Sequence, residues 1–343
     1  MSTGTESQMF AEAAQASSVV RGQLENNAVS VRRIGAQLRE MNPRAVVTCA
    51  RGSSDHAATF AKYSIEAHTK LLTTSAAPSM SSLYDAQPDL RGVVFLVISQ
   101  SGKSPDLLAA AESAKRNGAC VIALCNSPAS PLAQLAHHTI ALNAGPETSV
   151  AATKSYIASL SAIVHLVACW TSDQTLINSL MRAPDQLTQA WNLDWSAALP
   201  ILRPVNNLFV VGRGYGLGVA QEAALKFKET CGLHAEAFSA AEVKHGPMAL
   251  VGRDFPVLML SQNDESRSGI EQLASDFVAR GANVLIAGAQ ADGAISLPTI
   301  ASHAVIEPLL MVQSFYRMIA SLAVARGFDP DRPPHLNKVT ETL

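Results

Sequence analysis

Two stretches of the chain decide the fold: VVTCARGSSDHAATFAKYSIE at residues 46–66 and LFVVGRGYGLGVAQEAALKFKE at residues 208–229. Each starts with an apolar run and continues through an Arg-Gly pair into an alanine-rich segment. The two pairs begin at Arg51 and Arg213, which are 162 positions apart. This match indicates that the chain repeats itself at that spacing.

Two further landmarks recur in the same order. The apolar runs VVFLVISQ and VLMLSQ end in Ser-Gln, at Ser99 and Ser261, again 162 positions apart. The segments NGACVIALC and RGANVLIAG share a glycine, Gly118 and Gly281, at a spacing of 163. Three landmarks at essentially one spacing indicate two copies of one domain.

Each copy alternates short valine-, isoleucine- and leucine-rich runs with alanine-rich stretches. Apolar runs without polar alternation indicate strands buried on both faces, and hence a parallel sheet. We therefore predict an α/β fold with two tandem doubly wound parallel sheets, each an αβα sandwich of flavodoxin-like type. The expected parts are a helical lead-in at 1–40, a first domain at 41–190, a second at 191–330 and a tail at 331–343.

The composition limits the class of protein. The chain has 343 residues, of which 48% are hydrophobic, enough for two ordinary cores. A formal net charge of −2 without a basic segment argues against a nucleic-acid partner. The N-terminus lacks the pattern of a signal peptide, and the most apolar stretch, residues 157–170, is short for a membrane span and predicts a buried helix. We expect no membrane partner.

The sequence also predicts no metal and no nucleotide cofactor. The five cysteines show no CxxC spacing, which argues against a zinc site and a disulfide framework and favours a reducing, cytoplasmic compartment. The glycine-rich turn after the second copy's first strand has Leu217 where a dinucleotide-binding motif needs its third glycine.

Two polar turns follow strands of the first copy. The turn SQSGKS at residues 99–104 offers three hydroxyls, Lys103 and the backbone N–H groups of a helix start, which together can hold a phosphate. An ordinary turn with Ser104 as the helix cap would show the same pattern. The turn RGSS at residues 51–54 has serines that can bind a sugar or phosphate, or only shape the turn.

Three other segments carry groups suited to catalysis. Glu222, Lys226 and Glu229 lie on one helical face, where a carboxylate beside a lysine can act as a general base. A solvated Glu–Lys–Glu ladder is the alternative. His245 precedes a Gly-Pro break, so an accessible imidazole is expected there, although a structural histidine fits as well. Lys338, taken alone, has the pattern of a solvated tail lysine.

Together these segments resemble the isomerase half of glucosamine-6-phosphate synthase (glutamine–fructose-6-phosphate amidotransferase), within the sugar isomerase (SIS) superfamily. The resemblance covers nearly the whole chain. Its most specific matches are ALKFKET at residues 224–230, HAEAFSAAEVKHGPMAL at residues 234–250, SQSG at residues 99–102 and the closing P-x-x-L-x-K that ends at Lys338.

The resemblance implies a role for each matching residue. Glu229 would move a proton between C1 and C2, with Lys226 beside it. His245 would open the sugar ring, reaching across from the neighbouring subunit of a homodimer. Lys338 would close over the site and can form an imine with the ketose. The positions implied to bind the sugar phosphate are Gly52, Ser53, Ser54, Ser99, Gln100, Ser101, Ser104 and Ala152.

Several positions depart from the synthase pattern. Ser2 follows Met1 where the synthase has the catalytic cysteine of its glutaminase domain, so no glutaminase activity is expected. Arg51 replaces a smaller residue, GKSP at residues 102–105 replaces a Gly-Glu-Thr run, and Ala152 stands where a serine contacts the sugar. These changes resemble the glutaminase-less amino-sugar-phosphate deaminases of the same superfamily.

The sequence therefore predicts an amino-sugar-phosphate deaminase that converts glucosamine 6-phosphate and water into fructose 6-phosphate and ammonia. A fructosamine-6-phosphate deglycase or a galactosamine-6-phosphate deaminase would use the same groups. An isomerase subunit supplied with ammonia by a separate glutaminase is a further alternative. A non-catalytic phosphosugar regulator needs the phosphate turn but not Glu229, His245 and Lys338, so their joint presence favours an enzyme.

Overall fold

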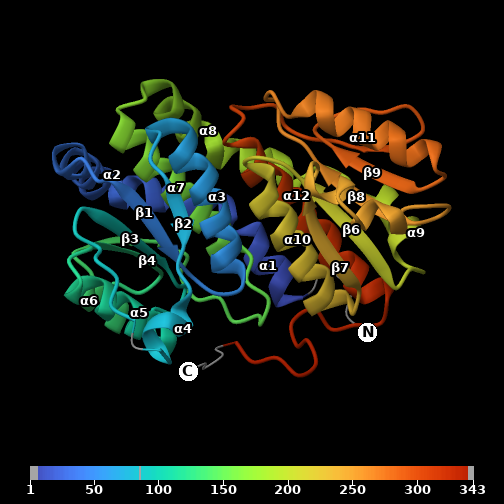
Figure 1. Ribbon diagram of the computed structural model, residues 1–343. Coiled ribbons are helices and arrows are strands. Elements are labelled where there is room, and N and C mark those ends of the chain that lie inside the picture. The colour runs from blue at the N-terminus through green and yellow to red at the C-terminus, as the bar shows by residue number, and fades with distance from the viewer. Residues whose placement is uncertain (1–6, 85, 339–343) are drawn as a thin grey trace. The chain divides into compact units, whose positions relative to one another are not determined.

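The computed structural model describes residues 7–84 and 86–338 and contains two compact units, each built on one five-stranded parallel sheet (Figure 1). We call them the first-sheet unit and the second-sheet unit. Of the described residues, the first-sheet unit comprises 18–84, 86–147, 155–181 and 337–338, and the second-sheet unit comprises 7–17, 148–154 and 182–336.

The first sheet has the strand order β2-β1-β3-β4-β5, with every neighbouring pair parallel. Its strands are β1 (Ala45–Cys49), β2 (Thr73–Ser75), β3 (Val93–Ile98), β4 (Cys120–Cys125) and β5 (His138–Ala141). Every residue of the central strand β3 is buried. This burial follows from helices that cover both faces of the sheet and explains why β3 has no polar alternation.

The second sheet repeats this topology. Its order is β10-β9-β8-β6-β7, which from the opposite edge is the order of the first sheet with each strand replaced by its counterpart. The strands are β6 (Asn207–Gly212), β7 (His234–Ser239), β8 (Pro256–Leu260), β9 (Asn283–Ala287) and β10 (Ile295–Leu297). The predicted fold of two doubly wound parallel sheets is confirmed.

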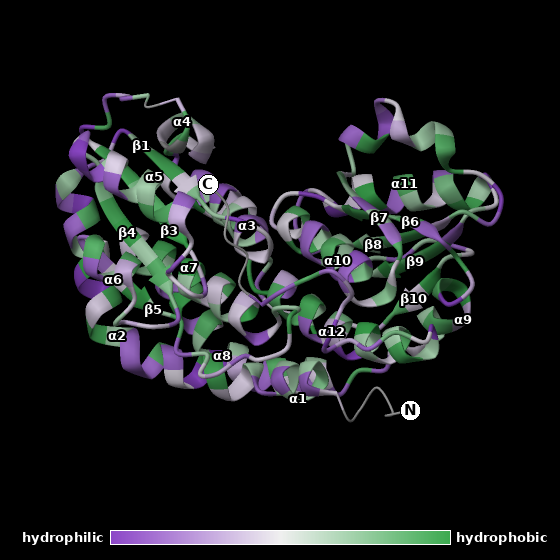
Figure 2. Ribbon diagram, turned by 90° about the horizontal axis from the view of Figure 1, so that it is seen from below, coloured by the Kyte–Doolittle hydropathy of each residue, from purple (hydrophilic) through white to green (hydrophobic). Residues whose placement is uncertain are grey.

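Helices surround both sheets, and their outward faces are hydrophilic while the strands are mainly hydrophobic (Figure 2). Those numbered before β6 are α1 (Gln8–Ala14), α2 (Ala16–Met41), α3 (Ser53–Thr69), α4 (Pro78–Ser82), α5 (Pro105–Arg116), α6 (Pro131–Leu135), α7 (Lys154–Thr171), α8 (Gln174–Trp191), η2 (Ser196–Ala198) and α9 (Leu199–Leu202). Those after β6 are α10 (Gly216–Cys231), η3 (Glu242–Lys244), η4 (Pro247–Leu250), α11 (Arg267–Ala279) and α12 (Glu307–Ala325).

The repeat extends to the conformation of its glycines. Gly52 and Gly214, each in the turn after the first strand of its copy, have φ values of +55° and +57°. Gly118 and Gly281, each before the fourth strand of its copy, have φ values of +90° and +83°. Residues with a Cβ rarely adopt this left-handed backbone conformation, so the shared glycines mark turns that both copies need.

The helix that starts after Ser104 is α5, and its apolar residues Leu107, Ala110, Ala111 and Ala114 are buried. Ser104 occupies the N-cap position, but its side chain makes no capping hydrogen bond. The N-cap position predicted for Ser104 is therefore confirmed, without a side-chain capping bond. Instead, Asp106 Oδ1 accepts from the Leu107 N–H at 2.8 Å, so a carboxylate satisfies a donor of the first turn.

The helical lead-in contains α1 and α2, which belong to different units. The buried stripe of α2 includes Val20, and Gln23 Nε2 donates to Leu142 O and Ala158 O of the first-sheet unit. In the second-sheet unit, by contrast, Ala13 O of α1 accepts from Gln313 Nε2 of α12. Packing thus divides the chain differently from linear boundaries at residues 40, 190 and 330, because each lead-in helix buries its apolar face in a different core.

Two long apolar helices lie in the cores. Residues 157–170 of α7 are buried, as predicted for that stretch. Within the described residues, α12 is the helix with the length and composition of a candidate membrane span, and 78% of its apolar window is buried inside the fold. Such burial is typical of a core helix.

His165 of α7 gives the first-sheet unit a measurable pH dependence. It is 8% exposed, and burial together with Arg32 lowers the pKa of its imidazole from 6.5 to about 4. The unfolded chain therefore binds more protons between these values, so this group's stabilising effect is complete above pH 6.5 and is lost as the pH falls toward 4. The corresponding change in the free energy of unfolding is roughly 3 kcal/mol.

We predict that His165→Gln flattens the decline of the unfolding temperature between pH 7 and pH 4 relative to the unsubstituted protein. Thermal unfolding followed by circular dichroism at several pH values measures both slopes. Equal slopes for the two proteins would show that His165 does not titrate on unfolding.

Candidate active site

The turn at residues 99–104 connects β3 to α5, and its own hydroxyls shape it. Ser99 is buried, and its Oγ accepts from the Gly102 N–H at 3.2 Å. Ser101 Oγ accepts from the Lys103 N–H at 3.3 Å. The side chain of Lys103 is exposed to solvent. The serine hydroxyl hydrogens are the kind of donors that hold a phosphate, whereas α5 starts at Pro105, which has no N–H, and the Leu107 N–H is already bonded to Asp106.

Gly102 fixes this turn against a neighbouring segment. It has a φ of +63°, and a Cβ there would meet Ser130 Oγ and lie 2.7 Å from Ser130 Cβ. Gly102 O accepts from the Leu132 N–H at 3.2 Å. The turn therefore packs on the start of α6, which leaves no space for a side chain at position 102.

The turn at residues 51–54 lies at the same edge of the first sheet, because β1 and β3 are parallel neighbours. This is where the order of a doubly wound sheet reverses and where ligands of such folds bind. Arg51 Nε donates to Asp106 Oδ2 at 2.8 Å, and the Asp106 side chain is 1% exposed. The ion pair thus joins the turn after β1 to the first turn of α5. Ser53 and Ser54 are half-buried at the start of α3.

Lys338 also belongs to the first-sheet unit, and it is not a solvated tail lysine. Its Nζ lies 3.3 Å from Glu147 Oε2, and its side chain is 25% exposed. The Glu147 carboxylate is fully buried and accepts from Ser155 N at 3.1 Å and Ser155 Oγ at 2.5 Å. These donors and the Lys338 ammonium together provide the buried Glu147 carboxylate with hydrogen-bond and ion-pair partners. Ala152, in the segment of the second-sheet unit before α7, is half-buried.

A buried ionic cluster lies on α10 in the second-sheet unit. Lys226 Nζ contacts Glu229 Oε2 at 2.6 Å and Glu222 Oε1 at 3.1 Å. The side chains of Lys226 and Glu222 have no exposure, and that of Glu229 is 17% exposed. The alternative of a solvated ladder is therefore wrong.

The cluster holds Lys226 in its charged form. Burial by itself lowers the pKa of Lys226, but the nearby carboxylates of Glu222 and Glu229 outweigh burial and raise that pKa above its ordinary value. An ammonium therefore donates to one oxygen of Glu229. Within residues 7–84 and 86–338, the other Glu229 oxygen makes no hydrogen bond, which leaves it open to a substrate proton.

Glu229 opens into a cavity of about 350 Å³. The cavity walls come from α10 and from the tail of the same unit, and they are Leu225, Lys228, Glu229, Gly232, Phe328, Pro334 and Leu336. The tail therefore covers the least buried member of the ionic cluster. A carboxylate at the edge of an apolar, partly enclosed space has the setting of a general base.

His245 follows η3 and is exposed, as its Gly-Pro neighbour predicts. Its backbone N–H donates to Glu242 O at 2.9 Å, which fixes the backbone but leaves the imidazole accessible. Its predicted place across a dimer interface stays a prediction. Within residues 7–84 and 86–338, no group of three or more His, Cys, Asp or Glu side chains could hold a metal ion.

The second copy does not repeat the phosphate turn. At the 162-residue spacing, Asp264 and Glu265 replace Gly102 and Lys103, and two carboxylates oppose an anion. The side chain of Gln262 is buried in this turn, where its Nε2 donates to Arg213 O and Asp264 Oδ2.

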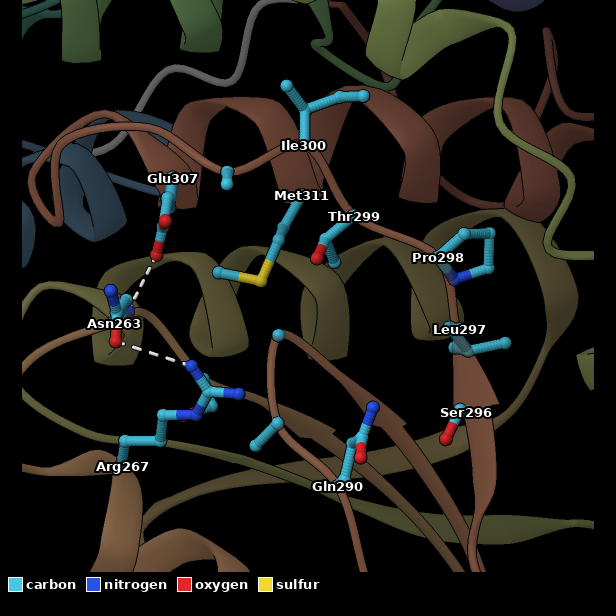
Figure 3. Close-up of a pocket in the computed structure, with 14 residues that line it drawn as sticks. Asn263, Arg267, Gln290, Ser296, Leu297, Pro298, Thr299, Ile300, Glu307 and Met311 are labelled. Atoms are coloured by element: carbon cyan, nitrogen blue, oxygen red, sulfur yellow. Dashed lines mark hydrogen bonds between the residues drawn. The ribbon is translucent and has the colours of Figure 1, made fainter.

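A separate cavity of about 440 Å³ lies at the carboxyl ends of β8, β9 and β10 (Figure 3). Its charged groups are already engaged with protein partners. Glu307 accepts from Asn263 N at 2.6 Å, and Arg267 contacts Glu271 at 3.1 Å and Asn263 Oδ1 at 3.3 Å. We therefore assign the candidate phosphate turn to the first copy.

Structure also shows partners that the sequence reasoning missed, namely Asp106, Glu147 and Tyr316. Asp106 carried a weak signal as an acid in a helix's first turn. Glu147 carried none, since its partner Lys338 is 191 positions away. Tyr316 OH donates to Glu222 Oε1 at 3.0 Å from α12, a mostly apolar helix in whose sequence nothing marks this tyrosine as a partner of a carboxylate.

We predict that Gly102→Ala destabilises the protein more than Gly145→Ala does. Both glycines are left-handed, with φ values of +63° and +65°, but a Cβ at Gly145 meets nothing within 4 Å. Both substitutions therefore carry the same cost of a left-handed backbone, about 1–2 kcal/mol in the free energy of unfolding. Gly102→Ala adds the clash with Ser130. Urea unfolding measures the difference, and equal destabilisation would contradict the tight packing of the turn.

The chain matches the SIS domain family over residues 41–168 and 201–326, one match for each sheet. It is 31% identical over 314 residues to a glutamine–fructose-6-phosphate aminotransferase (isomerizing) of Thermotoga maritima. The aligned region covers 85% of this chain and 50% of that relative. The chain thus spans about half the length of such relatives.

Two solved structures share the fold over almost the full chain. One is a protein of Silicibacter pomeroyi DSS-3 provisionally called a phosphosugar isomerase, 42% identical, with a TM-score of 0.91 over 95% of this chain and 100% of that chain. The other is a glucosamine-6-phosphate deaminase of Thermotoga maritima, 22% identical, with a TM-score of 0.77 over 98% of this chain and 100% of that chain. At this identity the second likeness shows the fold alone.

Proposed function

The chain belongs to the SIS domain family, and on that basis we propose that it isomerises and deaminates glucosamine 6-phosphate, giving fructose 6-phosphate and ammonia. The observation that carries the proposal is the Lys226 ammonium bound to Glu229 at the edge of a cavity. A carboxylate with one oxygen held and one open suits proton transfer between adjacent carbons. The resemblance of ALKFKET and the closing P-x-x-L-x-K to the synthase supports the same reaction.

The phosphate of the substrate binds the turn at residues 99–104. Hydroxyls of Ser99, Ser101 and Ser104 donate to its oxygens, with Gln100 beside them. Arg51 lies at the same sheet edge, where its ion pair with Asp106 holds the two turns together. Gly52, Ser53 and Ser54 line the neighbouring turn.

Proton transfer then converts the aldose into a ketose. His245, from the partner subunit of a homodimer, assists opening of the pyranose. Glu229 removes the proton from C2 of the open amino aldehyde and returns it to C1, while the aldehyde oxygen gains a proton to become a hydroxyl and the C2 amine loses one. The product is a C2 imine. Lys226 stabilises the negative charge that develops during the transfer.

Water attacks the C2 imine, and ammonia leaves as the ketone of fructose 6-phosphate forms. Lys338 can exchange with this imine only after it gives up its extra proton, because in the arrangement seen here it is paired with Glu147. The reaction needs neither a metal nor a nucleotide cofactor, and we propose a cytoplasmic location for it. The galactosamine epimer and a fructosamine 6-phosphate remain the alternative substrates.

We predict that purified protein releases fructose 6-phosphate and ammonia in equal amounts from glucosamine 6-phosphate, without glutamine or metal. Glu229→Gln should lower kcat at least about 10²-fold, because a positioned proton-transfer group contributes about 10²–10⁴-fold. Glu112→Gln, at an exposed position of α5, is the matched control and should leave kcat unchanged. Unchanged turnover in Glu229→Gln would remove Glu229 from the mechanism.

The proposed dimer has its own test. If His245 acts across the interface, mixing inactive Glu229→Gln chains with inactive His245→Ala chains should restore part of the activity, because one site of each mixed dimer is then intact. Coupled detection of fructose 6-phosphate measures the restored rate. No restoration after subunit exchange would place all catalytic groups of a site in one chain. A protein that binds phosphosugars without turning them over would instead be a regulator.

A further inference from the structure

Glu222 is as fully buried as Lys226 in the ionic cluster and has no assigned role. Its side chain has no exposure, and its Oε1 contacts both Lys226 Nζ at 3.1 Å and Tyr316 OH at 3.0 Å. Tyr316 is itself fully buried and comes from α12, which packs along α10. The carboxylate is therefore enclosed between α10 and α12, and it is not among the residues that line the cavity beside Glu229.

The first copy shows that the fold does not need these charges. At the 162-residue spacing, Glu222, Lys226 and Glu229 correspond to Phe60, Ser64 and Ala67 of α3. Phe60 and Ser64 are fully buried, so an apolar ring fills in α3 the core position that the Glu222 carboxylate fills in α10. Buried ion pairs rarely stabilise a fold better than well-packed apolar groups do. The charges in α10 therefore point to function.

Charge balance explains why a second carboxylate is present. A buried pair of Lys226 and Glu229 alone would be neutral, and protonation of Glu229 would leave an unpaired ammonium, which is costly in a buried site. With Glu222 present, Lys226 keeps a partner after Glu229 gains a proton.

We propose that Glu222 is a positioning residue that acts through Lys226: it balances the ammonium while Glu229 carries the substrate proton. Tyr316 holds the Glu222 oxygen that faces Lys226. The proposal rests on the proposed function of Glu229 as the proton carrier. The charges that act on the Lys226 ammonium are those of Glu222 and Glu229 of α10, and α12 contributes the Tyr316 hydroxyl.

A double-mutant cycle tests whether Glu222 acts through Lys226. Glu222→Gln should lower kcat for glucosamine 6-phosphate by about tenfold to 10²-fold, part of the full effect of a proton-transfer group, with KM changed less than about threefold, as expected when an interaction matters mainly in the transition state. In a Lys226→Met background the same substitution should have little further effect, since the charge that Glu222 balances is gone.

Two variants control for packing. Tyr316→Phe keeps the ring and removes the hydroxyl, and it should lower kcat less than Glu222→Gln does. Glu222→Asp keeps the charge and should recover part of the rate. Circular dichroism melts establish that each variant is folded before its rate is compared.

Two kinetic outcomes would overturn the proposal. Equal losses from Glu222→Gln with and without Lys226 would mean that Glu222 acts independently. A raised KM at unchanged kcat would make Glu222 a substrate-binding contact.

Failure of the proposed function is a separate result, shown by an unsubstituted protein that turns over none of these sugar phosphates. Charge balance is then measured without substrate, by carbon-13 NMR titration of the Glu229 carboxyl. Glu222→Gln should lower the pKa of Glu229, because the Lys226 charge would then act on Glu229 alone. An unchanged Glu229 pKa would overturn the role of Glu222.

Discussion

Parallel pairing of buried strands is the constraint on which the rest of this structure depends. Parallel neighbours need crossover helices, the helices bury both faces of the sheet, and all carboxyl ends of the strands meet at one edge. In the first-sheet unit this edge brings the turns after β1 and β3 together. The Arg51–Asp106 ion pair then joins them at the point where the strand order reverses.

The same topology carries different chemistry in its two copies. The first copy has a turn of serines, glycine and lysine that suits an anion, and its helix α3 has Phe60 and Ser64 in the core. The second copy replaces the glycine and lysine of that turn with Asp264 and Glu265. Its helix α10 instead carries the Glu222–Lys226–Glu229 cluster. A duplicated fold thus lets the phosphate binding and the proton transfer that we propose change separately, because each would lie on its own sheet.

Some parts of the site were readable from sequence and others were not. The strands, the helix after Ser104 and the repeat followed from apolar runs and glycine positions, since burial on both faces leaves a clear pattern. The face shared by Glu222, Lys226 and Glu229 was also readable from helical spacing. Whether that face lies in water or in the core was not, because a solvated ladder and a buried cluster have the same spacing.

The sequence by itself determined the duplicated α/β fold and the order of its polar turns, because burial of strands and the φ of turn glycines depend on local residue types. Tertiary structure alone decided which charges are paired and buried. Glu147 and Lys338 meet across 191 positions, and Tyr316 reaches Glu222 across 94. Such contacts depend on how distant segments pack, and packing sets the local dielectric environment that turns an ordinary Glu–Lys spacing into a charge-balanced site.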